Sequence, residues 1–167
     1  MPLIYSYFEA SWGWMSVTAT EIGLYSLCLP KPTMQESLNT LPSEGILLKD
    51  NNFKEIKYSL VHYFIGEKAN FDYPLDLTGY TDFQRSVLET TAKIPFGDLR
   101  SYGWIAEKIG KPRASRAVGQ ALGSNRLPIV IPCHRVVRSD GTLGGFSAGL
   151  GLKEKLIKLE RTDKRSS

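Results

Sequence analysis

Short runs of apolar, β-branched and aromatic residues fill the first third of the chain. Each run has the length and composition of a β-strand, and the nearby glycines Gly13 and Gly23 favour turns. The predicted strands cover residues 3–8, 14–20 and 23–29. Prolines at positions 30, 32 and 42 then indicate a loop. The pattern therefore predicts a small sheet at the start of the chain.

Helical periodicity follows this predicted sheet. Apolar residues recur every three or four positions from Phe53 to Phe64, which predicts an amphipathic helix over residues 52–65. The stretch Pro-Leu-Asp-Leu-Thr-Gly at residues 74–79 then has the composition of an extended linker. We therefore expect two small domains, a scaffold over residues 1–78 and a second domain over residues 79–167.

Capping signals mark the helices expected in the second domain. Thr81 and Gln84 have the spacing of a capping box at the start of one helix. Ser101 can cap the next helix, and Pro112 fits the first turn of the one after it. These two helices are predicted over residues 102–109 and 112–122. Two short helices joined by a tight glycine-containing turn predict a helix-turn-helix.

The C-terminal part of the second domain predicts a hairpin and one more helix. Asp140-Gly141 favours a hairpin turn, which would form a wing after the helix-turn-helix. A last helix is expected over residues 152–160, with Leu152, Leu156 and Leu159 on one face.

Charge distinguishes the two halves of the chain. Residues 1–79 hold five Lys, no Arg and nine Asp or Glu, a net charge of −4. Residues 80–167 hold seven Lys, nine Arg and eight acidic residues, a net charge of +8. A basic half indicates an anionic partner, of which nucleic acid is the obvious one, although a solvated basic surface gives the same count.

Composition limits the remaining classes. Two cysteines, Cys28 and Cys133, cannot form a disulfide framework and indicate a reducing compartment. With two histidines in the chain, no structural zinc site is expected. The first residues lack the features of a secretory signal, and no stretch is long and apolar enough for a membrane span, so we expect a cytoplasmic protein.

One cysteine and one histidine interrupt the apolar run of residues 129–137, Ile-Val-Ile-Pro-Cys-His-Arg-Val-Val. Pro132 fixes its own φ and favours an extended residue before it, so an apolar strand would present Cys133 at a rigid point. If the chain stays extended, Cys133 and His134 point to opposite sides, and the imidazole would reach the sulfur through one water. By residue type alone, a cysteine in such a run is usually a small buried hydrophobe, and that alternative stays open.

The string Pro-Cys-His-Arg-Val-Val resembles the active-site signature of the alkylguanine-DNA alkyltransferases, and the resemblance extends from about Phe83 to Glu160. It implies an α+β protein with an N-terminal α/β, ribonuclease H-like domain and a C-terminal, mostly helical, winged helix-turn-helix domain. It also implies a monomer without cofactor or metal, which binds the minor groove of double-stranded DNA carrying alkylated guanine.

The resemblance further implies a reaction. After flipping the base, the protein would transfer the alkyl group from the 6-oxygen of guanine to its own Cys133, once and irreversibly. Whether the 4-oxygen of alkylthymine is also a substrate stays open. The implied catalytic residues are Cys133, His134, Glu160 and Asn125. The implied DNA contacts are Tyr102, Gly103, Lys111, Ala114, Ser115, Arg116 and Ser139. The implied substrate pocket is formed by Pro132, Val136, Phe146, Ser147 and Lys153.

Three of these implied roles have a physical rationale. Small residues at the start of the helix that carries Arg116 would let it enter the narrow minor groove, where Arg116 would replace the flipped nucleotide in the stack. Glu160 would orient the imidazole of His134, and Tyr102 would help to rotate the target nucleotide.

The chain departs from the family pattern at Phe146, where many members have a tyrosine whose hydroxyl helps to protonate the departing guanine. Ser147, Lys153 or water would have to compensate. Two other functions stay open: a non-catalytic DNA-binding module, and a cysteine hydrolase using Cys133, His134 and Glu160. The presence of Cys133 argues against the first, and the arginine-rich half and small-residue helix against the second.

Overall fold

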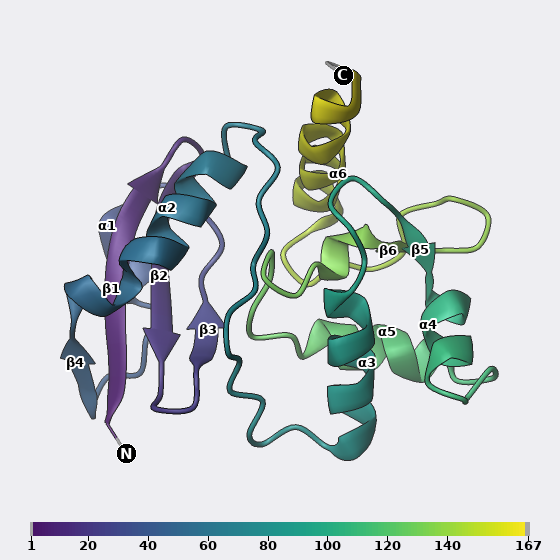
Figure 1. Cartoon of the computed structure of the whole chain (residues 1–167), viewed down its shortest axis with the longest axis horizontal. Helices are drawn as coiled ribbons and strands as arrows, with labels where there is room; N and C mark the ends of the chain where they lie inside the picture. Colours follow the sequence, from purple (N-terminus) through teal and green to yellow (C-terminus); the bar gives the residue numbers. More distant parts are fainter. Residues whose placement is uncertain (1, 166–167) are drawn as a thin grey trace. The chain divides into compact units, whose positions relative to one another are not determined.

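The computed structural model describes residues 2–165, with side chains as far as residue 161. The chain forms two compact units, residues 1–77 and 78–167, which are described separately (Figure 1). The separate roles expected for the two domains stay predictions. Among the described residues, no helix has the length and apolar character needed to cross a membrane.

The N-terminal unit is built on a four-stranded mixed sheet with the order β3-β2-β1-β4. The three predicted strands are present as β1, β2 and β3, which form an antiparallel meander, and β4 pairs in parallel with β1. The strands are β1 (Leu3–Ala10), β2 (Gly13–Ala19), β3 (Leu24–Leu27) and β4 (Ile46–Leu48).

Gly13 is required where β2 begins. Its φ is +135°, and a Cβ atom there would lie 2.5 Å from the carbonyl oxygen of Lys31. Trp14 and Lys31 exchange two backbone hydrogen bonds of 2.8 Å at this point. A side chain at position 13 would break this close approach.

Helices cover both faces of the sheet: α1 (Met34–Leu38) lies on one face, and η1 (Asp50–Phe53) with α2 (Lys54–Tyr63) lies on the other (Figure 1). The amphipathic pattern of residues 52–65 is confirmed, since Ile56, Leu60 and Tyr63 are buried. Sequence reasoning assigned the region of α1 and β4 to a loop. These elements have five and three residues, too few for periodicity to show.

The C-terminal unit is mostly helical. Its elements are α3 (Asp82–Ala92), β5 (Arg100–Ser101), α4 (Tyr102–Lys108), α5 (Ser115–Gly123), η2 (Cys133–Arg135), β6 (Val136–Val137) and α6 (Leu150–Arg165). The Thr81–Gln84 capping box is present, and the Ser101 hydroxyl accepts from Trp104 N–H at 2.9 Å. Helices α4 and α5 pack against each other as the predicted helix-turn-helix. The α+β class is therefore confirmed.

Two predicted boundaries in this unit were wrong. Helix α5 begins at Ser115 and not at Pro112, because residues 112 and 113 form a turn in which the Ala114 N–H donates to the Lys111 carbonyl. The Asp140-Gly141 turn does form, but no strand follows it. Instead, β6 pairs in parallel with β5, so the predicted hairpin is absent from the described residues.

The buried face of α6 also differs from the predicted apolar stripe. Leu156 and Ile157 are buried, and two charged residues of the same helix, Lys153 and Glu160, are buried with them. Leu152 and Leu159 are only partly buried. Hydrophobic periodicity cannot reveal such a face, because half of its buried side chains are ionisable.

Candidate active site

A tight turn presents Cys133, where the sequence predicted an extended strand. Pro132 has φ −79° and ψ 65°, the geometry of an inverse γ-turn, and the Cys133 N–H donates to the Ile131 carbonyl at 2.8 Å. Residues 133–135 then form one turn of 3-10 helix, in which the Arg135 N–H donates to the Pro132 carbonyl. The prediction of an extended chain was wrong. Pro132 has no N–H to donate, but its carbonyl accepts a hydrogen bond from Arg135 and so closes the turn over residues 133–135.

The segment before the cysteine is held by Asn125. Its side-chain N–H donates to the Ile131 carbonyl at 2.9 Å, and its Oδ1 accepts from the Leu127 N–H at 2.9 Å. Between these contacts, the buried Ile129 has φ +72°, a strained conformation for a β-branched residue. Asn125 therefore ties the end of α5 to the cysteine turn across a backbone that the surrounding packing must hold in place.

Cys133 faces a cavity of about 690 Å³ in the C-terminal unit. The sulfur-bearing residue is only 8% exposed, so the thiol lies at the inner wall of this cavity. The lining residues are Tyr102, Ser115, Arg116, Gly119, Gln120, Leu122, Gly123, Cys133, Arg138, Gly144, Gly145, Phe146 and Ser147. The cavity thus joins the start of α4, one face of α5 and the 144–147 loop.

Tyr102 fits between two glycines in this wall. A Cβ atom at Gly144 would lie 2.6 Å from the tyrosine oxygen, and one at Gly119 would lie 3.7 Å from the ring. The Tyr102 hydroxyl donates to the Gly145 carbonyl at 3.3 Å. The two glycines set the position of the ring at the cavity.

We predict that Gly144→Ala destabilises the protein by about 1–3 kcal/mol, because φ at this position is +70° and the new methyl group would displace Tyr102. Thermal melts would measure the change. Gly145→Ala is the matched control, since its φ is not positive and a Cβ atom there meets nothing within 4 Å. Equal melting temperatures for the two variants would contradict the assigned packing.

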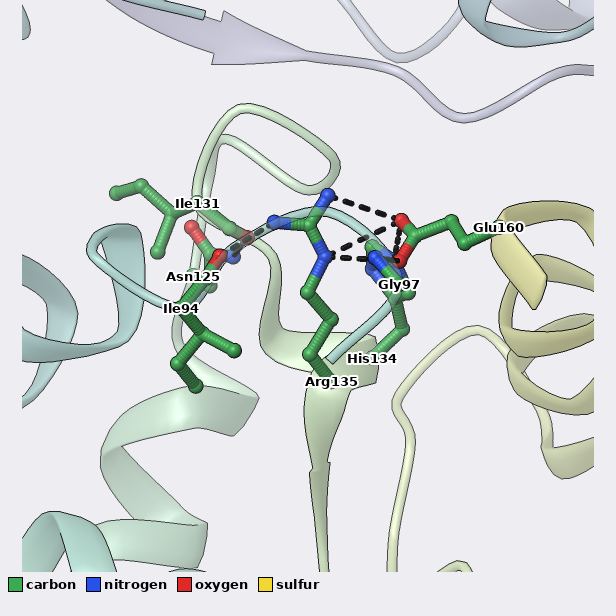
Figure 2. Close-up of polar contacts among 7 residues, drawn as sticks. All are labelled: Ile94, Gly97, Asn125, Ile131, His134, Arg135 and Glu160. Carbon is green, nitrogen blue, oxygen red and sulfur yellow. Dashed lines mark hydrogen bonds and ion pairs between the residues drawn. The ribbon is translucent and has the colours of Figure 1, made fainter. Parts of the chain in front are cut away.

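A buried ionic cluster includes His134 and Arg135, the two residues that follow the cysteine (Figure 2). The Glu160 carboxylate contacts His134 Nε2 at 2.6 Å and accepts from Arg135 Nε at 2.9 Å and Nη2 at 3.0 Å. The Gly97 N–H adds a fourth donor at 3.1 Å, and Arg135 Nη1 donates to the Ile94 carbonyl at 2.6 Å. His134, Arg135 and Glu160 are all buried, so each charge depends on these partners.

These contacts fix the protonation of the cluster. Despite the opposing effect of burial, hydrogen bonds from His134 and Arg135 and the positive charge of Arg135 lower the pKa of Glu160 from 4.5 to about 2, so it is a carboxylate at neutral pH. Burial lowers the pKa of His134, which is therefore a neutral imidazole. Since a carboxylate can only accept, Nε2 of His134 carries the proton and Nδ1 carries the lone pair.

The thiol of Cys133 is protonated in the resting protein. Burial raises its pKa above the ordinary value of 9.0, although a hydrogen bond with Asn125 and the charge of Lys153 act in the opposite direction. A thiol is a weak nucleophile, so Cys133 would need a base to remove its proton before it could act as one.

Lys153 holds the loop that carries Phe146. Its buried ammonium donates to the carbonyls of Val136 (2.6 Å), Gly145 (3.1 Å) and Leu143. Burial lowers the pKa of Lys153 to about 8. The lysine therefore links β6 to the loop of residues 143–145 through hydrogen bonds to their carbonyls.

The structure brings many of the predicted site residues together. One cavity is lined by Tyr102, Ser115, Arg116, Cys133, Phe146 and Ser147. His134, the residue after Cys133, pairs with Glu160. Pro132, Val136 and Lys153, predicted as pocket residues, are not among the lining residues. The other predicted DNA contacts are Gly103, Lys111, Ala114 and Ser139; Lys111 and Ser139 are exposed, whereas Gly103 and Ala114 are partly buried.

Both units match known proteins. Residues 82–162 match the family model described as the DNA-binding domain of 6-O-methylguanine DNA methyltransferase, and residues 3–77 match its ribonuclease-like domain. The chain belongs to the 6-O-methylguanine DNA methyltransferase family. The α/β, ribonuclease-like fold of the first half and the mostly helical fold of the second half, both expected from the sequence, are thereby confirmed.

Members of this family from several organisms resemble the chain closely. The methylated-DNA–protein-cysteine methyltransferase of Methanosarcina barkeri is 50% identical over 113 residues, 68% of this chain and 71% of the relative. The Mycolicibacterium paratuberculosis protein of the same name is 52% identical over 99 residues, 59% of each chain. The crystal structure of Mycobacterium tuberculosis OGT in complex with DNA superposes with a TM-score of 0.82 at 35% identity, covering 95% of this chain and 93% of that one.

Sequence reasoning missed Arg135 and Gly144 in this methyltransferase fold. Arg135 is part of the quoted motif, and an arginine inside an apolar run was a signal that a buried anion must face it. Gly144 carried no comparable signal, since its requirement comes from Tyr102, a residue 42 positions earlier.

Proposed function

We propose that this chain repairs alkylated DNA by transferring the alkyl group from the 6-oxygen of guanine to the sulfur of Cys133. The observation that carries the proposal is the position of Cys133, a buried thiol on the wall of a cavity and backed by the His134–Glu160 pair. Its DNA partner follows from the family and from the basic second half of the chain. We further propose that the protein is a monomer and acts in the cytoplasm, wherever the genomic DNA is.

His134 is the base in this proposal. Its Nδ1 lone pair accepts the thiol proton through one water, and the Glu160 carboxylate stabilises the imidazolium that results. The thiolate then attacks the alkyl carbon in line, the bond from that carbon to the 6-oxygen breaks, and guanine leaves. A thioether is not readily hydrolysed, so each molecule reacts once.

DNA binding in this proposal uses the α4–α5 pair. Helix α5 enters the minor groove with Ala114 and Ser115 at its start, and Arg116 fills the gap left by the flipped nucleotide. Tyr102, Gly103, Lys111 and Ser139 contact the backbone of the duplex, where phosphate contacts position the protein.

Intact-protein mass spectrometry after mixing the protein with a duplex oligonucleotide that contains 6-O-methylguanine tests this function. We expect a stoichiometric gain of one methyl group, located on Cys133 by peptide mapping. Unchanged mass with retained binding would support a non-catalytic DNA-binding module instead. Turnover without a covalent adduct would support a hydrolase.

We predict that Arg116→Ala slows repair of duplex substrate by at least about tenfold more than it slows dealkylation of free O6-benzylguanine. A free base does not have to be extruded from a stack, a step that costs about a few kcal/mol in the duplex. Single-turnover rates on both substrates measure the difference. Equal slowing on both would mean that Arg116 supports the fold or the cavity and not base flipping.

A further inference from the structure

Arg138 is a cation in the cavity wall that none of these roles uses. It follows β6 directly and lines the cavity with Tyr102 and Phe146. Its N–H donates to the Thr142 carbonyl at 2.9 Å, and its carbonyl accepts from the Gly141 N–H at 2.9 Å. The turn therefore fixes the backbone of Arg138 at the cavity, while the side chain stays exposed.

The side chain of Arg138 has no structural task within the part of the chain that the structure describes: no ion pair or side-chain hydrogen bond holds its guanidinium. The nearby carboxylate of Asp140 instead accepts from the N–H and hydroxyl of Thr142 at 3.0 and 2.7 Å. Burial dominates the pKa shifts of Tyr102 and Lys153, but the charge of Arg138 also acts on both groups. Arg138 therefore brings a positive charge to the cavity that Tyr102 also lines.

Alkyl transfer leaves a negative charge on the departing guanine. As the sulfur–carbon bond forms, the carbon–oxygen bond breaks and its electron pair stays on the 6-oxygen and the purine ring. The thiol proton has passed to His134, so the departing guanine is an anion until it takes a proton from water. A donor placed where this charge develops accelerates the transfer.

Ser147 also lines the cavity and has a hydroxyl donor, but this donor is neutral. The remaining groups are engaged elsewhere or lack a donor. The side chain of Phe146 has no polar hydrogen. The three ammonium hydrogens of Lys153 are matched by three backbone carbonyls behind the wall. Arg116 is the other arginine that lines the cavity, and it belongs to the start of α5, the helix assigned to the duplex.

We propose that Arg138 contacts the departing guanine and stabilises its negative charge, replacing the donor that Phe146 lacks. This inference rests on the proposed function, because it assigns a residue to the leaving group of that reaction. The guanidinium has a permanent charge and five N–H donors, which suits an anionic ring with several acceptors.

Benzyl transfer from free O6-benzylguanine tests the proposal, since that substrate has no phosphate. We expect Arg138→Ala to lower the transfer rate at least about tenfold, and Arg138→Lys to recover part of it. Arg85→Ala is the matched control, because Arg85 is an exposed arginine of α3 that does not line the cavity. It should leave the rate unchanged.

A second substrate separates leaving-group stabilisation from a structural effect. A benzylated guanine with bromine at carbon 8 leaves as a more stable anion, so the deficit of Arg138→Ala should shrink with it. The rate at which iodoacetamide alkylates Cys133 should stay unchanged, because this reaction has no guanine leaving group for Arg138 to stabilise.

Three results would overturn the inference. A normal rate of Arg138→Ala on the free base, with weaker duplex binding and a salt dependence reduced by about one charge, would make Arg138 a phosphate contact. A parallel loss of iodoacetamide reactivity would mean that it acts on Cys133. If the unchanged protein gains no alkyl group from O6-benzylguanine or from a methylated duplex, the proposed function itself fails, and the role of Arg138 fails with it.

Discussion

Cys133→Ala is expected to abolish alkyl transfer completely while leaving DNA affinity within about threefold of the original value. Sulfur is the proposed nucleophile, and alanine offers no atom that can take the alkyl group. Affinity for DNA comes mainly from phosphate contacts, which this buried side chain does not make. Intact mass after incubation with methylated duplex measures transfer, and a binding titration at fixed salt measures affinity.

Cys28→Ala is the matched control for this variant. Cys28 is the other cysteine of the chain, is only partly buried, belongs to the N-terminal unit and is not among the residues that line the cavity. Its loss should leave stoichiometric methylation intact. Methyl transfer to the Cys133→Ala protein, or its loss in the Cys28→Ala protein, would show that the nucleophile has been assigned to the wrong atom.

Glu160→Gln is expected to slow alkyl transfer by about 10²- to 10⁴-fold and to destabilise the fold by about 3–5 kcal/mol. The amide cannot stabilise the imidazolium of His134, and the buried guanidinium of Arg135 loses its only ion-pair partner among the described residues. Single-turnover kinetics and chemical denaturation measure the two effects.

Glu154→Gln is the control for this change, because it makes the same substitution on the same helix. Glu154 pairs with Lys158 at the surface, where both side chains are more than half exposed, so we expect at most about 1 kcal/mol. A Glu160→Gln protein as stable and as active as the Glu154→Gln protein would contradict the buried cluster.

The stability difference between the original protein and Glu160→Gln should also depend on pH. The pKa of Glu160 is depressed in the folded protein, to about 2 from an ordinary value of 4.5. Its contribution is therefore present above about pH 4.5 and is lost as the pH falls towards 2. Denaturation curves of both proteins over this range should converge, and a constant difference would mean that ionisation of Glu160 is not its source.

Features that depend only on residues close to one another in the sequence could be predicted from it. The capping boxes and glycine turns act within four residues, so they predicted where α3 and α4 begin. The strands β1 to β3 were predicted from short apolar, β-branched and aromatic runs and from the glycine turns near them. The residue identities at 132–137 also sufficed to indicate the family, since the chemistry of a thiol and an imidazole belongs to the residues themselves.

Only the tertiary structure decided which charges are buried and how the cysteine is presented. Glu160 and Lys153 are charged residues on α6, and they are buried because His134, Arg135 and the carbonyls of the 136–145 segment meet them in space. The left-handed Ile129 and the γ-turn at Pro132 persist because Asn125 and the packed core hold them. The sequence thus determined which chemical groups the protein has. Their protonation and orientation depend on contacts between segments that are distant in the sequence, because burial and pairing set the free energy of a charge.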